Sequence, residues 1–417
     1  MSERERDVHL VFVGAGHCHC LALVQLARDL VPQLPTTVTL ISDSAFAYYS
    51  GMLPAAVAGQ FREDELRIDV AALCRALAVR FVLGRATRIE HAAKRVHVQR
   101  SDSDAPCIIA YDLLSVNVGS VTRGAELDGV SQHAICTRPI ALLPARLAAR
   151  EADFTALQPP RCPAVLVVGG GAAGCELAMA VCGRHRALFG AANVSLLTSC
   201  TSELGTGGAR LSSVLKAALQ ERGIKLIAGR AIRVDADRTV YAVDNNKNGV
   251  ASAHAAELVL WAAGASPGAL LAASDLPLSG DGFLDVRRSL QSVASDFVFA
   301  CGDCCTVRDS PQIEKAGVFA VREAPILAQN LCAARHNLAH PEAPKPYVDY
   351  AAQASFLRLI ITGDGGAIGC KWGFATPSSS AANWLKSKLD LDFIRLFDAD
   401  RLPRNSAFAL QLAASEE

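Results

Sequence analysis

The chain has 417 residues, a length that predicts two or three domains. Its 41 basic residues are matched by 41 acidic ones, so no positively charged footprint for nucleic acid is present and no nucleic-acid partner is expected. Although 51% of the residues are hydrophobic, no apolar run approaches 18 residues and the start, Met1–Asp7, does not resemble a signal peptide, which predicts a cytoplasmic protein.

The first recognisable unit is a glycine-rich turn after the apolar run 11–13. In a strand-turn-helix unit the first glycine permits the tight turn and the second lets the backbone approach a pyrophosphate. A helix-compatible segment, 21–30, and a second apolar run, 38–41, follow, which predicts a β-α-β unit. A histidine takes the place of the usual third glycine, and an acid stands one residue beyond the ribose-binding position. The residues predicted to bind this nucleotide are Gly14, Gly16, His17, His19 and Asp43.

The next elements complete the first half of the chain. Residues 111–118 are predicted to form a buried strand that ends at Gly119, a further candidate for cofactor binding. Residues 145–163 are richer in proline and polar residues and are predicted to link this half to a second domain.

A second glycine-rich turn begins at Gly169, 155 residues after Gly14, and follows the apolar run 165–168. It carries the complete pattern, because Gly171 and Gly174 occupy the second and third positions. A helix-compatible segment, 175–188, and an apolar run, 194–197, again predict a β-α-β unit. Two such turns imply two nucleotides. No acid lies beside Thr198 at the end of the second run, so the choice between NADH and NADPH stays open.

Three later segments complete the architecture. A buried strand within 257–267 ends at Gly264, and another within 296–303 ends at Gly302 and Asp303. A helix is predicted to begin near Lys315. The segment 347–397 lies outside both nucleotide folds and is predicted to form strands at 354–360 and 366–370 and a helix at 381–397.

The last of these helices has a mixed pattern of apolar and charged residues. Leu385, Leu389, Phe393 and Leu396 share one side, while Trp384 falls elsewhere and a lysine, Lys386, interrupts the apolar side. Packing on the rest of the protein or on a second copy in a homodimer is favoured over peripheral contact with a membrane, and both readings stay open.

The order of these motifs resembles the pyridine nucleotide-disulfide oxidoreductase superfamily of flavoproteins over residues 8–375. Three short strings, 49–54, 315–322 and 361–364, look like its type II NADH dehydrogenase-like branch associated with selenide, water dikinase. The resemblance implies an α/β fold with two Rossmann-like domains, the second inserted in the first, and a small α+β C-terminal domain. The implied boundaries are an FAD-binding domain at 1–145 and 281–345, an NAD(P)H-binding domain at 146–280, and a C-terminal domain at 346–417.

The resemblance also assigns roles to single residues. It implies that Asp303, with Gly302, binds FAD in the first fold, while NAD(P)H binds in the second. A helix beginning near Lys315 would direct its positive end, reinforced by the lysine, at the flavin. Glu176 resembles the family glutamate near the nicotinamide. Each residue also has a structural reading: a turn aspartate for Asp303, a solvated lysine for Lys315, and a favourable first-turn acid for Glu176.

The fourteen cysteines indicate which electron path is available. Disulfide reductases of this superfamily carry a redox cysteine pair either on the helix after the second strand of the FAD fold or as Cys-x-x-Cys inside the NAD(P)H fold. Here the first place, 51–54, lacks cysteine. The second, 200–280, contains only Cys200. Cys301 and Cys304 are interpreted as packing residues, and the run 17–20 is not predicted to bind metal, because its side chains diverge and no second ligand cluster exists. Electrons are therefore expected to pass directly from flavin to an acceptor.

These observations predict an FAD-dependent NAD(P)H oxidoreductase that passes electrons to a quinone-like or other small acceptor. Two alternatives remain from the sequence. One is a nucleotide-sensing flavoprotein module linked to selenium metabolism. The other is an enzyme similar to sulfide:quinone reductase, which needs two cysteines at the flavin, for which Cys136 and Cys332 are the candidates.

Overall fold

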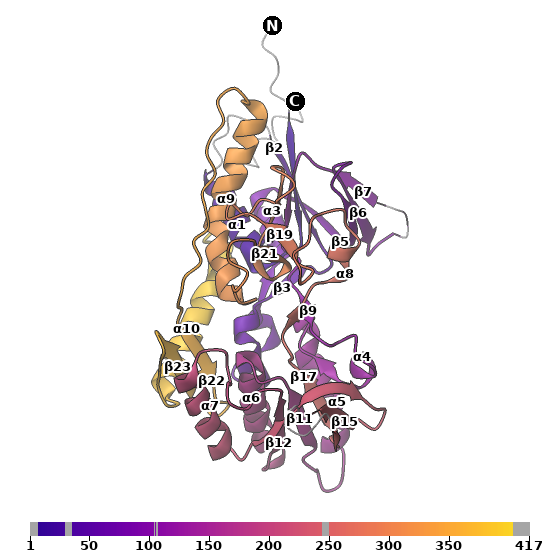
Figure 1. The fold of residues 1–417 in the computed structure, drawn as a ribbon, viewed down its shortest axis with the longest axis vertical. Helices are drawn as coiled ribbons and strands as arrows, with labels where there is room; N and C mark the ends of the chain where they lie inside the picture. Colours follow the sequence, from indigo (N-terminus) through magenta and orange to yellow (C-terminus); the bar gives the residue numbers. More distant parts are fainter. Residues whose placement is uncertain (1–6, 30–35, 104, 106, 244–249, 403–417) are drawn as a thin grey trace.

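The computed structural model describes residues 7–29, 36–103, 105, 107–243 and 250–402. It has two lobes, each built on a parallel sheet, with a C-terminal unit beside the lower lobe (Figure 1). Two predicted elements reach beyond the described residues. These are the last part of the predicted C-terminal domain, 403–417, and the last residue of the predicted helix 21–30.

The upper lobe contains a seven-stranded sheet in the order β20-β8-β1-β2-β5-β6-β7. The first five strands are parallel and the last two pair antiparallel, and helices cover the sheet. Strand β1 is almost wholly buried, as its apolar sequence requires when helices lie against the sheet. These elements are β1 (Val8–Val13), β2 (Thr36–Ser42), β5 (Arg80–Glu90), β6 (Arg95–Arg100), β7 (Cys107–Ala110), β8 (Leu113–Val116), β20 (Val298–Ala300), α1 (His17–Asp29), α3 (Val70–Leu77) and α9 (Gly317–Ala339).

The lower lobe contains a five-stranded parallel sheet in the order β10-β17-β11-β12-β13. This order repeats β20-β8-β1-β2-β5 of the upper lobe, with the strand before each glycine-rich turn in the same central place. Both predicted β-α-β units and the α/β fold class are therefore confirmed. The elements are β10 (Ile135–Cys136), β11 (Ala164–Val168), β12 (Asn193–Thr198), β13 (Lys225–Ala228), β17 (Leu258–Trp261), α6 (Ala172–Phe189) and α7 (Ala209–Glu221).

Two short elements depart from the boundary implied at residue 145. Strand β10 belongs to the second sheet, and helix α2 (Leu53–Val57) buries its apolar side chains in the core around α6, although both precede residue 145 in the chain. Both placements depend on partners far along the chain: β10 pairs with β17, and the apolar side chains of α2 pack on α6.

Smaller elements connect and extend the two sheets. A three-stranded antiparallel sheet, β14-β15-β16, belongs to the lower lobe, and β9 pairs with β18 where the chain crosses between the lobes. The remaining elements are β3 (Phe46–Tyr48), β4 (Arg67–Asp69), β9 (Val121–Thr122), β14 (Arg230–Val234), β15 (Val240–Val243), β16 (Ala251–His254), β18 (Ala265–Ser266), β19 (Leu284–Val286), β21 (Cys305–Val307), α4 (Val130–His133), α5 (Leu143–Thr155) and α8 (Ala269–Ala272).

The C-terminal unit consists of an antiparallel sheet, β22 (Arg358–Ile361), β23 (Ala367–Lys371) and β24 (Phe374–Ala375), followed by α10 (Ser380–Ile394). Its hairpin packs on the lower lobe, where Arg222 donates from Nε to the carbonyl of Thr362 at 2.8 Å and from Nη2 to Asp364 at 2.5 Å. The α+β unit matches the expectation, and the predicted helix 381–397 ends three residues earlier, at Ile394. Within the described part of the chain, every helix is too short or too polar to cross a bilayer.

Candidate functional site

The first glycine-rich turn packs directly against Asn117, at the end of β8. Gly14 has a φ of +90°, and a Cβ there would lie 2.4 Å from the carbonyl oxygen of Asn117. A Cβ at Gly16 would lie 2.1 Å from Oδ1 of the same residue, so neither position accepts a side chain. Asn117 also donates from Nδ2 to the carbonyl of Cys301 at 2.7 Å. It thereby joins the turn to the Gly-Asp segment, a role that the sequence analysis missed.

The two histidines of the turn point in different directions. His19 is fully buried; its Nδ1 lies 2.6 Å from the carbonyl of Gly14 and its Nε2 lies 2.8 Å from the hydroxyl of Ser115. Burial lowers the pKa of His19 to about 3, so the ring is neutral and donates to the carbonyl. His17 instead places Nε2 3.2 Å from the carbonyl of Tyr48. The structure therefore gives His19 a role in holding the turn, while His17 is the ring nearer the junction of the lobes.

The second turn has one crowded glycine and one open glycine. A Cβ at Gly174 would lie 1.8 Å from the carbonyl of Gly169, so this position must stay small for α6 to reach the turn. At Gly171, the residue before α6, nothing lies within 4 Å of a Cβ position. The open backbone at this helix start fits a dinucleotide pyrophosphate, which helix N-termini attract. Gly119 and Gly264 each lie three residues after the end of a strand, β8 and β17 respectively, and nothing lies within 4 Å of a Cβ position at either glycine.

The ends of β2 and β12 carry the two ribose positions. Asp43 is exposed directly after β2, where the sequence analysis expects the ribose of the first nucleotide. At the end of β12, Thr198 donates to the carbonyl of Cys200, and its Oγ1 lies 2.2 Å from where a Cβ on Gly170 would stand. A hydroxyl, and not a carboxylate, therefore faces the second turn.

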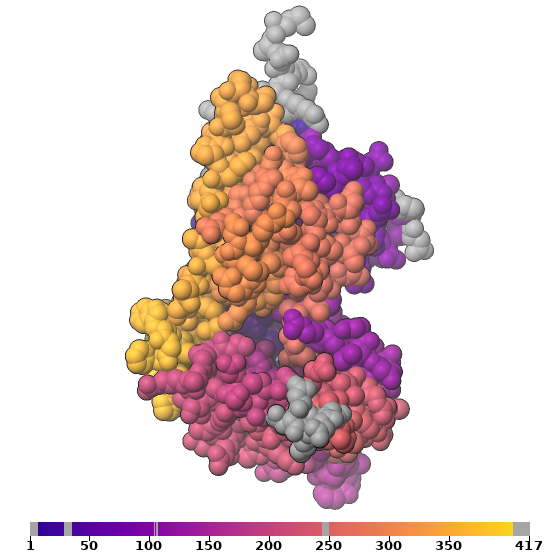
Figure 2. Space-filling model, in the orientation of Figure 1, coloured from indigo at the N-terminus to yellow at the C-terminus, as the bar shows by residue number. Residues whose placement is uncertain are grey.

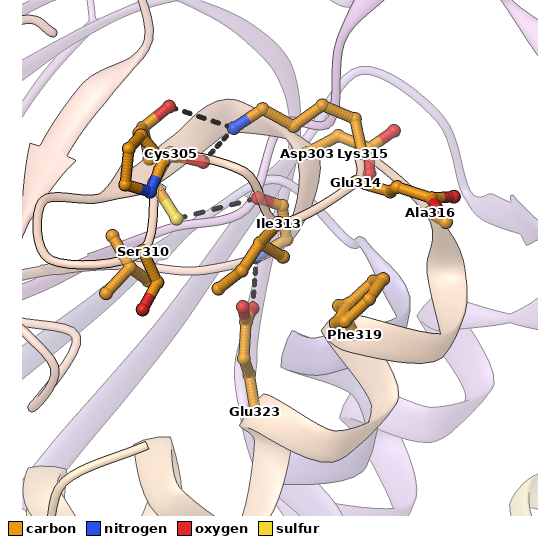
Figure 3. A pocket seen from close by; sticks show the side chains of 13 residues that line it. Asp303, Cys305, Ser310, Ile313, Glu314, Lys315, Ala316, Phe319 and Glu323 are labelled. Carbon is orange, nitrogen blue, oxygen red and sulfur yellow. Dashed lines mark hydrogen bonds between the residues drawn. The ribbon is translucent and has the colours of Figure 1, made fainter. Parts of the chain in front are cut away.

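The Gly-Asp segment is held by a buried carboxylate and an interlobe ion pair. Gly302 donates its N–H to Oε2 of Glu323 at 2.5 Å, and burial raises the pKa of Glu323 to about 7 (Figure 3). The carboxylate of Asp303 accepts from Ser120 Oγ at 3.1 Å and from Arg138 Nη2 at 3.0 Å. Glu323 lies on α9, six residues or nearly two helical turns past its start at Gly317, and it was not predicted from the sequence because its spacing marks only a helix interior.

Lys315 lines the same small pocket as Asp303 and Glu323 (Figure 3). Its Nζ donates to the carbonyl of Cys305 and to Thr306 Oγ1, at 3.0 Å for the latter, and lies 4.2 Å from the ring centre of Phe283. Helix α9 begins at Gly317, two residues later, close to the predicted start. The ammonium is therefore bonded to the β21 strand and points away from the start of α9, so the lysine does not reinforce the positive end of the helix as the resemblance implied (Figure 3).

A buried polar cluster forms where the three units of the chain meet. Glu176, on α6, accepts the N–H of Ile361 at 2.9 Å, and burial raises its pKa to about 7 against the opposing effect of Lys386. Lys386, on α10, donates to the carbonyl of Gly51 at 2.6 Å and to Asp390 Oδ2 at 2.9 Å. The side chains of Lys386 and Asp390 are only 8% and 7% exposed. The cluster links both nucleotide lobes to the C-terminal helix.

Aromatic rings cover the side of this cluster that faces α1. Tyr49 and Phe393 stack with ring centres 4.5 Å apart, and His17 meets each of them edge-on at 5.3 and 5.7 Å. In the space-filling view, indigo surface from the N-terminal part of the chain is set back between the two lobes (Figure 2). From the sequence, Tyr49 was only part of a family string and Lys386 only an interruption of an apolar helix face; the four-residue spacing of Lys386 and Asp390 was the available signal.

The cysteines form no disulfide: all fourteen are free. Cys301 and Cys304 are buried, and burial raises the pKa of the Cys304 thiol to about 12, which disfavours the reactive thiolate. Cys136 lies on β10 of the lower sheet, whereas Cys332 lies on α9, 15 residues after its start at Gly317 and therefore about 22 Å along the helix axis. These two candidates do not converge on one site.

The fold and the site together define a dinucleotide-dependent oxidoreductase with two Rossmann-like domains. The model of the pyridine nucleotide-disulphide oxidoreductase family matches residues 8–325, and the chain belongs to this family. FAD and NAD(P)H are the cofactors of the family, and the open backbone at Gly171 and the Asp303 segment fit such groups.

Individual relatives match more weakly. A type II NADH:quinone oxidoreductase from Staphylococcus epidermidis is 28% identical over 125 residues, which cover 30% of this chain and 29% of the relative, so the match spans less than a third of that protein. The structure of NDH2 from Plasmodium falciparum in complex with NADH has a TM-score of 0.78 at 14% identity, covering 99% of this chain and 98% of that one. Sulfide:quinone oxidoreductase from Aquifex aeolicus has a TM-score of 0.70 at 19% identity, covering 95% and 93%. The two structures share the fold with this chain.

Proposed function

We propose that this protein is an FAD-dependent NAD(P)H:quinone oxidoreductase. The observation that carries the proposal is the cluster of a partly buried Glu176 with the buried Lys386 and Asp390, which lies where both nucleotide lobes and the C-terminal helix meet. When bound, FAD accepts hydride from NAD(P)H and passes electrons on to a second acceptor. Quinone as that acceptor is supported by the type II NADH:quinone oxidoreductase relative.

Separate side chains of this protein bind the cofactors, transfer the proton and stabilise negative charge in such a reaction. The open turn at Gly171 holds the NAD(P)H pyrophosphate, and Asp303, fixed by Arg138, holds FAD. Glu176 exchanges the proton that quinone reduction requires, because burial keeps its carboxyl protonated up to about neutral pH. Lys386 holds a positive charge beside it, where negative charge develops on the acceptor.

The direct test is a steady-state assay with NADH or NADPH and a water-soluble quinone. We expect quinone-dependent oxidation of at least one of the two nucleotides. A nucleotide-sensing module would bind nucleotide and flavin without turnover, so binding without oxidation would contradict the proposed function. Sulfide as electron donor is not favoured, since Cys136 and Cys332 lie apart.

Glu176→Gln is expected to slow quinone reduction by about 100-fold, the contribution typical of a general acid. In the wild type, we expect the rate to fall as the pH rises through about 7, because Glu176 loses its proton there. In Glu176→Gln this step should disappear, since the amide does not titrate. The measurement is the pH profile of kcat for both proteins between about pH 5.5 and 8.5. This range extends on the order of one pH unit or more either side of the expected loss of the Glu176 proton. An unchanged profile in the variant would remove Glu176 from the proposed mechanism.

The same substitution has a stability readout that serves as its control. The folded pKa of Glu176, about 7, lies above the ordinary 4.5, so the unfolded chain releases this proton first and wild-type stability falls as the pH rises between these values. The loss has an upper bound of about 3 kcal/mol. Glu176→Gln does not lose this stability, because its amide does not titrate. The difference between the Tm of the variant and that of the wild type should therefore increase from pH 5 to pH 8. The glutamine oxygen can still accept the N–H of Ile361.

We further propose that the C-terminal unit contacts a membrane surface on the cytoplasmic side, where a lipid-soluble quinone would enter. Its apolar residues are turned outward: Trp372, Phe374 and Trp384 are 72%, 67% and 65% exposed, whereas Lys386 and Asp390 on the same helix are buried. Cations lie at two of these rings: Lys371 Nζ is 4.2 Å from the ring centre of Trp372, and the guanidinium of Arg210 is 5.5 Å from that of Phe374. Exposed tryptophans beside cations suit the headgroup region of a bilayer.

The triple variant Trp372→Ser, Phe374→Ser and Trp384→Ser is expected to lose flotation with anionic liposomes while keeping FAD. Each large side chain contributes roughly 1.5–3 kcal/mol when fully buried in an apolar phase, so the partition coefficient should fall at least 100-fold. The matched control is Ile108→Ser with Val250→Ser, two apolar residues exposed by 50% and 69% outside this unit. Equal flotation of the triple variant and the control would contradict the membrane assignment.

A further inference from the structure

A cysteine, a histidine and a glutamate form a chain of contacts at the edge of the lower lobe, away from the nucleotide turns. Cys162 lies two residues before the start of β11, Glu151 lies on α5, and His185 lies on α6. Because Gly169 follows the opposite end of β11, this group sits at the far end of the sheet from the second nucleotide turn. None of the three side chains takes part in the proposed reaction.

The geometry orders the three groups as nucleophile, base and orienting acid. His185 places Nε2 3.0 Å from Oε1 of Glu151 and Nδ1 3.8 Å from Sγ of Cys162, whose thiol also has the carbonyl of Ala191 at 3.4 Å as an acceptor. Glu151 is 3% exposed at its side chain and His185 is fully buried, and Arg184 donates from Nε to both carboxylate oxygens at 2.8 and 3.0 Å. An ionised carboxylate only accepts, so Nε2 carries the imidazole proton and the Nδ1 lone pair faces the thiol.

The charge states agree with this order. Burial acts to raise the pKa of Glu151, but the hydrogen bonds from His185 and Arg184 outweigh it and the pKa lies below its ordinary value. The carboxylate is therefore ionised at neutral pH. Burial raises the pKa of the Cys162 thiol, so this thiol keeps its proton at neutral pH and needs a base in order to react. The cysteine is partly exposed, which leaves Sγ open to a small molecule.

We infer that Cys162 is a nucleophilic thiol and a site of covalent modification by hydroperoxides, with His185 as its general base and Glu151 as the residue that orients the imidazole. In the reaction, the thiol proton passes to Nδ1 of His185 and the sulfur attacks one oxygen of hydrogen peroxide. An S–O bond forms as the O–O bond breaks, and the leaving hydroxide takes the proton from His185 and departs as water. The sulfur is oxidised by two electrons to a sulfenic acid, and the peroxide is reduced.

Cys200 provides an internal control within the same molecule. It is exposed, and its Sγ lies 3.1 Å from the hydroxyl of Ser202 and not beside an imidazole. The test exposes the FAD-loaded wild type, His185→Asn and Glu151→Gln to hydrogen peroxide in the presence of a sulfenic-acid trap such as dimedone. Peptide mass spectrometry then gives the labelling rate of Cys162 and of Cys200 in each sample.

Without its base, Cys162 should be labelled about 100-fold more slowly in His185→Asn, and its rate should fall by a smaller factor in Glu151→Gln, while Cys200 keeps one rate in all three proteins. FAD content and Tm show that each variant is folded. The inference is overturned if Cys162 of the wild type stays unlabelled when Cys200 is labelled, or if the Cys162 rate is the same in all folded proteins. Should His185→Asn not fold, the comparison of Glu151→Gln with the wild type decides in the same way.

Discussion

Asp303→Ala is expected to purify nearly free of FAD, as a colourless protein. The carboxylate of Asp303 is positioned by Ser120 and Arg138 from two other segments, which is the pre-organisation a ligand-binding side chain needs. Its removal also leaves the Arg138 guanidinium without this partner in a site where the arginine side chain is only 25% exposed. We expect the FAD dissociation constant to rise at least about 100-fold, the effect of losing a charged hydrogen-bonding group worth roughly 3 kcal/mol.

The control for this variant is Asp309→Ala, which removes an aspartate that is 61% exposed and 3.5 Å from Arg288. An exposed pair of this kind contributes little to stability, so full FAD loading is expected. Equilibrium titration of the apoprotein with FAD, followed by flavin fluorescence, gives both constants. If Asp303→Ala binds FAD with wild-type affinity, the assignment of Asp303 is wrong.

Gly171→Val is expected to abolish reduction by NAD(P)H while leaving FAD bound. Because nothing lies within 4 Å of the Cβ position, the valine fits the folded protein without a clash. It would, however, occupy the space in which the pyrophosphate approaches the start of α6. The expected result is a rate of flavin reduction at least about 100-fold below the wild type at equal nucleotide concentration, with unchanged FAD content.

The matched control is Gly280→Val, which also adds valine where nothing lies within 4 Å, at an exposed position outside both turns. Rapid mixing with NADH and with NADPH measures the reduction rate of both variants. Wild-type kinetics in Gly171→Val would show that nucleotide does not bind at this turn.

The fold was predictable because its signals are local. Gly14 and Gly169, each after a short apolar strand and before a helix, specify the two β-α-β units, and the structure confirms both. The β10 strand was not predictable, because two residues carry no measurable periodicity and its place depends on pairing with Leu260 and Trp261 far along the chain.

The candidate site was predictable only where a motif marks it. Glu176 and Asp303 stand close to glycines of known spacing, so their neighbourhood followed from the sequence. Asn117 and Glu323 act through contacts with residues about 100 and 21 positions away, and such contacts leave no periodic signal. Lys386 interrupts an apolar helix face in the sequence because one of its two partners, the carbonyl of Gly51, is 335 residues distant; the other, Asp390, is four residues away.

The central claim is that hydride passes from NAD(P)H to bound flavin without a cysteine relay. The most direct measurement is anaerobic mixing of the FAD-loaded protein with NADH or NADPH while the flavin absorbance is followed, before and after exposed thiols such as Cys200 are alkylated. We predict that the flavin band bleaches with at least one nucleotide and at the same rate in treated and untreated protein, because the reaction needs no thiol. A flavin that stays oxidised with both nucleotides, or bleaching that alkylation abolishes while FAD stays bound, would contradict the account.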